Sequence, residues 1–149
     1  MLRRLHPIAG TIGFASIALF WTSTLTVEIA GGPGAIAALK QAILWGMLVL
    51  IPALALTGFS GMKSLSGPAH GLASTKLRRM PFIAGNGILV LIPSAVFLHM
   101  KASTGAFDTA FYAVQAVELV AGAINLTLLG LNLRDGLRMT RRRRQVSKR

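Results

Sequence analysis

The sequence predicts an all-α integral membrane protein, a bundle of four transmembrane helices. Hydrophobic residues make up 53% of the 149 residues, charged residues make up 13%, and the mean hydropathy is +0.62. A soluble domain of this length would carry more charge on its surface. Four apolar runs, each of about 20 residues or more, are long enough to cross a bilayer core. They cover about residues 7–27, 36–59, 81–100 and 110–133.

The first two runs are joined by a short turn. Pro7 suits the first turn of a helix, where its missing N–H needs no partner. The first run exceeds the roughly 7–15 residues of a signal-peptide core, so we expect a retained helix. The glycines and proline of Gly31–Gly34 predict a turn. In the second run Pro52 predicts a kink, and we place Lys40 and Trp45 near the outer interface, where cations and indole rings are favoured.

The segment Ser60–Arg79 is rich in Gly, Ser and Lys, which is typical of a loop between spans. The third run begins at Pro81, and residues 101–108 form the turn into the fourth run. Residues 140–149 are strongly basic and follow the last span. We therefore divide the chain into a transmembrane domain, 1–139, and a basic cytoplasmic tail, 140–149.

The distribution of Lys and Arg predicts the orientation. All but two of the 16 Lys and Arg residues lie on the side of the N-terminus, and the exceptions are Lys40 and Lys101. The positive-inside rule therefore places both termini in the cytoplasm. Compactness and richness in Ala, Gly and Arg favour a bacterial inner (plasma) membrane protein.

An internal repeat appears when the chain is compared with itself at an offset of 75 residues. The two halves then match at Arg3 and Arg78, Arg4 and Arg79, Ile8 and Ile83, Ala9 and Ala84, and Gly10 and Gly85. The repeat predicts two tandem helical hairpins related by a pseudo-two-fold axis. The two glycines would let the first and third helices approach each other. Chance matching in a sequence rich in Ala, Gly and Leu is the alternative.

The fourth run carries a polar stripe centred on Glu118. Steps of three and four residues place Gln115, Gly122, Asn125, Leu129 and Asn132 on the same helix face. A polar or charged group turned toward lipid is costly, roughly 2.5–3.5 kcal/mol for a central Asp, so we expect this stripe to face protein or trapped water. The predicted polar seam consists of Glu118, Gln115, Asn125, Asn132, Asn86 and His99.

The candidate partners of Glu118 within this seam are His99, Gln115 and Asn86. If the seam serves proton or ion movement, Glu118 is the residue that carries it. The alternative is that the amides only bond one helix to another, which contributes about 0.6–2 kcal/mol each.

The three histidines and the absence of cysteine limit which cofactors the chain could hold. Haem b held by His6 and His70 is an alternative, although His70 falls in the predicted loop. His6 and His99 would lie roughly 30 Å apart and cannot share an iron. The chain has no cysteine, no cluster with metal-ligand spacing, and no hydrolase or phosphate-binding motif. We therefore predict no cofactor, no metal site and no catalytic residue.

Two classes of function remain. We favour a non-enzymatic subunit or accessory protein of a membrane complex, packed against partner helices or further copies of itself. The alternative is a haem-b electron-transfer protein or a small transporter with a polar site around Glu118.

The tail should be disordered in isolation and should bind anionic lipid, with about 1 kcal/mol from each cation near the surface. Nucleic acid is not expected as its partner, because the run lacks aromatic side chains. The basic residues are Arg141, Arg142, Arg143, Arg144, Lys148 and Arg149.

The predicted orientation can be tested by labelling single cysteines from either side of the membrane. Because Gly32 and Thr104 lie in the predicted outer turns, an impermeant thiol reagent should modify cysteines there in intact cells. A cysteine at Ser66 should react only after the membrane is opened. Labelling of Ser66 from outside, with protection of the other two, would overturn the assignment.

Overall fold

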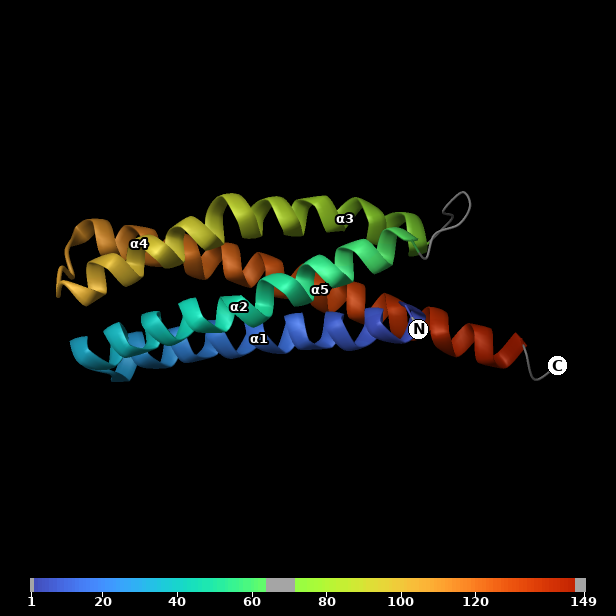
Figure 1. Cartoon of the computed structure of the whole chain (residues 1–149), viewed down its shortest axis with the longest axis horizontal. Coiled ribbons are helices and arrows are strands. Elements are labelled where there is room, and N and C mark those ends of the chain that lie inside the picture. Colours follow the sequence, from blue (N-terminus) through green and yellow to red (C-terminus); the bar gives the residue numbers. More distant parts are fainter. Residues whose placement is uncertain (1, 64–71, 147–149) are drawn as a thin grey trace.

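The computed structural model describes the backbone of residues 2–63 and 72–146 and the side chains of residues 7–59 and 79–138. Within these residues the chain is helical and contains no strand. The elements are α1 (Leu2–Ala30), α2 (Pro33–Lys63), α3 (Leu72–Asn86), the π-helical turn η1 (Gly87–Leu91), α4 (Ile92–Ser103) and α5 (Thr109–Val146). Figure 1 shows that α3, η1 and α4 follow one another as a single rod.

Four segments are long and apolar enough to cross a membrane. They are Pro7–Ala30, Pro33–Phe59, Arg79–Ser103 and Thr109–Arg138. The prediction of an all-helical chain with four apolar spans is therefore confirmed for the described residues. The start of α1 and the end of α5 lie at the same end of the molecule (Figure 1). We call the opposite end, which holds the turns before α2 and before α5, the outer end, after the predicted orientation.

Two helices extend beyond their expected limits. Much of the predicted loop Ser60–Arg79 is helical, because α2 continues to Lys63 and α3 begins at Leu72. Residues 64–71 lie outside the described residues. Helix α5 continues to Val146, beyond the expected end of the fourth span at residue 133 and into the predicted tail 140–149. No Gly or Pro follows Gly136, and Arg, Leu and Met are strong helix formers, so nothing in this stretch ends the helix.

The π-helical turn has a local cause in Pro93. A proline lacks the N–H that would donate to the carbonyl four residues earlier, here that of Leu89. Just before it, the Ile92 N–H donates to the Gly87 carbonyl, five residues back. The rod thus changes register at η1. Helix α2, in contrast, continues through Pro52 as one helix.

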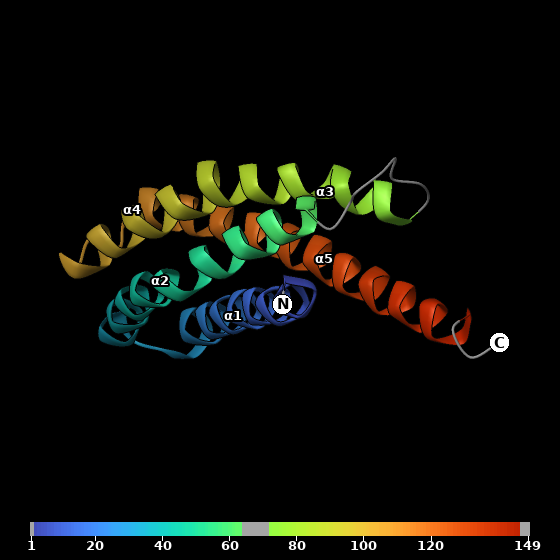
Figure 2. The ribbon, with the colours of Figure 1, turned by 45° about the vertical axis from the view of Figure 1, so that its right-hand side comes forward.

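The helices pack as a ring of neighbours. Helix α1 packs against α2 and α5, α2 also packs against α3 and α4, and α5 packs against α3, η1 and α4. Figure 2 shows the same neighbours from a second direction. Among the described residues, the backbone of α1 makes no contact with that of α3, η1 or α4. The backbone of α2 likewise makes none with that of η1 or α5.

This arrangement contradicts one expectation from the repeat. The first and third spans do not approach each other at Gly10 and Gly85. A side chain at Gly10 would meet Thr57 of α2, and one at Gly85 would meet nothing within 4 Å. The two glycines lie on helices at opposite corners of the ring, so their small size cannot bring these helices together.

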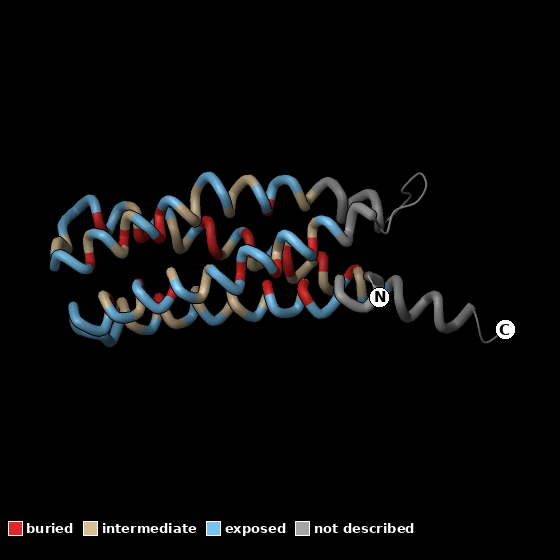
Figure 3. Tube along the Cα trace, in the orientation of Figure 1, coloured by how far each residue is buried: buried red, intermediate tan, exposed pale blue. Residues whose placement is uncertain are grey.

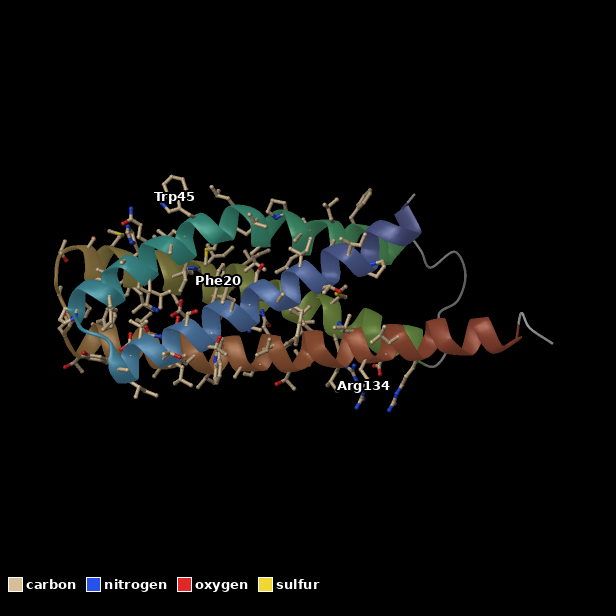
Figure 4. All side chains as sticks on the ribbon, turned by 90° about the horizontal axis from the view of Figure 1, so that it is seen from below. Phe20, Trp45 and Arg134 are labelled. Atoms are coloured by element: carbon tan, nitrogen blue, oxygen red, sulfur yellow. The ribbon has the colours of Figure 1, made fainter. Side chains whose placement is uncertain are left out.

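The buried residues line the inner faces of the helices (Figure 3). Two apolar clusters divide this interior. The inner apolar layer consists of Ile17, Leu50, Ile83 and Leu129. The outer apolar layer consists of Ile36, Leu98, Ala102 and Phe111. Large apolar side chains also cover the outside, and Figure 4 shows Trp45 projecting away from the helices.

Asp108 caps the first turn of α5. Its Oδ1 accepts a hydrogen bond of 2.9 Å from the Phe111 N–H, and its Oδ2 pairs with the Lys101 ammonium. Gly105 has φ +69°, a conformation that glycine adopts without strain, and it turns the chain from α4 toward this cap.

The cap should make stability depend on acid pH. The hydrogen bond from Lys101, and then that from the Phe111 N–H, hold the pKa of Asp108 below its ordinary value. A folded-state pKa that is lowered stabilises the protein above the unfolded pKa, and this contribution is lost as the pH falls through the folded value, here below about pH 4. Asp108→Asn keeps an acceptor for Phe111 but cannot ionise. Thermal unfolding in detergent should show a gap between the wild type and this variant at pH 7 that narrows as the pH falls below about 4. A gap independent of pH would contradict this account.

Candidate functional site

A buried ion pair joins α2 to α5 across the interior. Lys40 Nζ donates to Glu118 Oε2 at 2.6 Å, and the two side chains are 1% and 12% exposed. Because the backbones of α2 and α5 do not contact each other, the long lysine side chain spans the gap between opposite helices. Lys40 lies seven residues into α2 and Glu118 nine into α5, about 10 and 13 Å from the outer helix ends. The pair therefore lies in the outer half of the predicted spans.

Two further polar side chains accompany the pair. Gln115 Nε2 donates to the same Glu118 Oε2 at 3.1 Å, while Gln115 Oε1 is buried without a hydrogen-bond partner. Glu28 is half-buried two residues before the end of α1, and its Oε1 is buried without a hydrogen-bond partner. We call Lys40, Gln115 and Glu118 the outer polar cluster.

A small cavity borders Glu118. Its volume is about 60 Å³, and its walls come from α1, α2, η1 and α5. Such a volume can hold several water molecules where polar partners exist. The lining is mostly apolar, and the side chains on it that carry oxygen or nitrogen are those of Glu118, Thr24 and Trp21.

Trp21 fixes one wall of this cavity. Its Nε1 donates to the Leu119 carbonyl of α5 at 2.9 Å. The indole lies against Gly122, where an added Cβ would stand 3.0 Å from Trp21 Cδ1. The glycine on the predicted stripe thus gives the indole room to reach the α5 backbone.

A second group of polar side chains joins the third span to α5. Asn86, directly before η1, donates through Nδ2 to the Ala121 carbonyl and to Asn125 Oδ1, both at 2.9 Å. Asn125 is fully buried and donates to the Ile83 carbonyl at 3.3 Å. These bonds join the third rod to α5 where its helical register changes.

The inner end of α5 carries two more buried polar residues. Asp135 accepts a hydrogen bond of 3.0 Å from Arg79, and Arg134 lies 3.7 Å from its other oxygen. Arg134 itself projects away from the helices (Figure 4). Asn132 is 4% exposed, and neither atom of its amide has a hydrogen-bond partner.

The predicted partners of Glu118 are partly wrong. Gln115 does donate to it, but Asn86 is engaged with Asn125, and His99 Nδ1 is buried without a partner. The strongest partner is Lys40, which we had assigned to the headgroup interface. The position of Lys40 within its span could have indicated this partner. A lysine seven residues into an apolar span lies closer to an interior acid than to water.

Several predicted residues lie where side chains are not described. These are His6, His70 and the six basic residues of the tail, so the structure does not test the haem-binding or lipid-binding assignments. Among the described side chains, no group of three or more His, Asp and Glu residues could hold a metal ion. Comparisons of the chain with protein-family models, curated proteins and solved structures give no match.

The Lys40–Glu118 pair should show strong coupling in a double-mutant cycle. Lys40→Met or Glu118→Leu alone leaves one charge buried and unpaired, and we expect each to lower the free energy of unfolding by about 3–5 kcal/mol. The double variant removes both charges and should recover most of that loss. Denaturant unfolding in detergent measures all four proteins.

Lys101, whose side chain is 28% exposed and pairs with the exposed Asp108, provides the matched control. Lys101→Met removes a cation that solvent screens, so its effect should be small. If the double variant instead loses the sum of what the two single variants lose in free energy of unfolding, the two buried charges do not interact.

Proposed function

We propose that this protein is a non-enzymatic integral subunit or accessory protein of a bacterial inner-membrane complex, with both termini in the cytoplasm. The observation that carries the proposal is which partners the side chains of the polar seam bond to. Its side chains mainly bond one helix to another within the chain, through Lys40 and Glu118, through Asn86 and Asn125, and through Trp21 and the Leu119 carbonyl. Such bonds define a fixed scaffold.

The outer surface supports the same function. Bulky apolar side chains are exposed on every span, for example Leu19 on α1, Leu48 on α2, Leu89 on η1 and Val120 on α5. In a membrane these faces can receive lipid or the helices of a partner or of a second copy, since association there depends on close packing. We further propose a four-helix transmembrane bundle of two related hairpins, because α1 contacts α5 and α2 contacts α3, as a pseudo-two-fold axis requires.

The basic tail would secure the protein to the membrane surface. The backbone of α5 is helical to Val146, so Arg141–Arg144 would follow the last span as a basic helical extension. Anionic headgroups attract such residues by about 1 kcal/mol each near the surface. This interaction would hold the cytoplasmic end of α5 against the leaflet.

Site-specific photo-crosslinking in the native membrane tests the subunit assignment. A photoreactive amino acid would replace Leu19, Leu48, Leu89 or Val120 in turn, so that each exposed face is sampled. We expect one or two adjacent faces to give a discrete adduct with another integral membrane protein, while the remaining faces give lipid adducts. The buried Leu98 is the control and should give no intermolecular adduct. Lipid adducts alone from all four faces would overturn the proposal.

A small transporter is the second candidate, and the cavity beside Glu118 favours it. In that case Glu118→Gln would abolish flux in proteoliposomes while assembly stayed intact. If Glu118 is only structural, the wild-type protein itself should show no flux. The haem-b alternative receives no support from the described side chains, among which His99 is the one histidine. An absorption spectrum without a Soret band after expression with adequate haem would remove it.

A further inference from the structure

The outward face of α2 carries two polar side chains near the depth where lipid is hydrocarbon. Trp45 is 67% exposed and projects away from the helices (Figure 4), and Gln41, one turn earlier, is exposed on the same face. Within the described part of the chain, no hydrogen bond joins either side chain to another residue. Trp45 lies twelve residues after Pro33, about 18 Å from the outer end of a span of 27 residues. It is therefore near the middle of its span and not at the outer interface, where we expected it.

An exposed indole at this depth lacks an acceptor for its N–H. Indole rings are favoured at membrane interfaces because the N–H can be solvated there while the rest of the ring is apolar. Near the middle of a bilayer the lipid consists of acyl chains, which accept no hydrogen bond. A donor exposed there is costly unless a protein acceptor covers it. The outward face of α2 thus requires a protein partner with an acceptor at the depth of Trp45.

Such an acceptor lies on a different face of the same chain. A groove of about 350 Å³ lies between α3 and α5, and Asn86 is its polar side chain. Asn86 uses Nδ2 to donate to the Ala121 carbonyl and to Asn125, while its Oδ1 accepts no hydrogen bond from the described residues. The remaining walls come from one face of α5, namely Ala116, Val117, Val120, Ala121 and Ile124.

The groove matches Trp45 in depth and in size. Ala121 lies twelve residues after Thr109, about 18 Å from the outer end of α5, which is the depth of Trp45 in α2. Helices α2 and α5 both begin at the outer end and run in the same direction (Figure 1). The buried Ala121 leaves room between the exposed Val117 and Val120. Pockets of roughly 300–1,000 Å³ hold whole small ligands, so this groove can receive an indole ring.

One copy cannot join its own donor to its own acceptor. Helices α2 and α5 stand at opposite corners of the ring without backbone contact, and Trp45 projects away from the helices. A second copy inserted with the same orientation brings its Trp45 to the depth of the first copy's groove, because the two copies share one sequence. A different protein would instead have to supply an acceptor to one face and a donor to another. A second copy therefore satisfies both groups with a single kind of contact.

We propose that copies of this protein associate head-to-tail in the membrane, with Trp45 of one copy seated in the groove of the next and its Nε1–H donating to Asn86 Oδ1. Because the contact uses two different faces of each copy, it either closes into a ring or continues as a row. The inference goes beyond the proposed function, since the contact needs no other protein. It holds whether the assembly belongs to a larger complex or moves an ion.

The chain contains no cysteine, so engineered cysteines can test the contact in the purified protein. Leu48, close to Trp45 on α2, and Ile124, in the groove, each lie fifteen residues after the start of their helix, about 22 Å from the outer end. In liposomes at low protein density, a mixture of Leu48→Cys and Ile124→Cys proteins should give a dimer with a short bifunctional thiol reagent. The double variant should give a ladder of multimers.

The single variants and a second face supply the controls. Each single variant alone should remain monomeric, because a head-to-tail contact does not bring two identical faces together. Leu19 is exposed on α1, on a face that the proposal leaves free. Leu19→Cys mixed with Ile124→Cys should therefore give no adduct.

The role of the indole N–H can be measured separately. Trp45→Phe keeps an aromatic ring but removes the donor. Energy transfer between labelled copies, measured in liposomes as lipid dilutes the protein, gives the dissociation constant of the assembly. We expect this constant to rise about 3- to 30-fold in Trp45→Phe, which corresponds to one interhelical hydrogen bond. Leu19→Ala, which also truncates an exposed side chain, should leave the constant unchanged.

Three results would overturn the proposal. They are the absence of an adduct between the Leu48 and Ile124 cysteines, dimers formed by one single variant alone, and equal association of Trp45→Phe and the wild type. Adducts of the Leu48 or Ile124 cysteines with a different protein in native membranes, without adducts between copies, would identify a partner helix in place of the second copy. The liposomes contain this chain alone, so the contact between copies can fail while the subunit assignment holds, and the reverse.

Discussion

The pairing of Lys40 with Glu118 is the constraint on which the interior of this protein depends. Neither side chain can face lipid without a large cost, and each sits about two to three turns inside its span, so the two must find each other. The resulting bond fixes the rotation of α2 and of α5 about their axes. It also fixes their separation, because the reach of a lysine side chain replaces backbone contact between these helices. The remaining polar stripe of α5 is then directed inward.

Once α5 is oriented, the other helices follow from local chemistry. Trp21 brings α1 against α5 at Gly122, and Asn86 holds the third rod against the same helix through Asn125 and a backbone carbonyl. The register change at η1, caused by Pro93, alters which faces of α3 and α4 point at α5. Asn86 lies directly before this change, and Leu98 lies after it in the outer apolar layer. A continuous α-helix would present these two residues at a different relative angle, since a π turn adds one residue to the ring closed by each hydrogen bond.

The sequence predicted the spans because hydrophobic length is a property of each segment alone. It also predicted that Glu118, Gln115 and Asn125 share a face of α5, since their spacing follows from the helical period. It did not predict Lys40 as the partner, because partners depend on which helices are opposite each other, and this is a property of the whole packing. The same reason explains the error at Gly10 and Gly85. A repeat in the sequence relates two segments to each other but does not make them neighbours, and here the related helices stand at opposite corners.

The polar groups along α5 differ in how completely they are satisfied, and this difference separates scaffold from site. Asn86 and Asn125 donate to specific acceptors, and Asp135 is held by Arg79, so these groups act as fixed joints. At the outer polar cluster, in contrast, Gln115 Oε1 accepts no hydrogen bond and a cavity adjoins Glu118. A buried acceptor that receives no hydrogen bond costs about 1–3 kcal/mol. Asn132, nearer the inner end of α5, leaves its whole amide unused. Within the described part of the chain, the outer cluster therefore differs from the joints at Asn125 and Asp135, because it combines a buried ion pair with an unused acceptor on Gln115 and a cavity at Glu118.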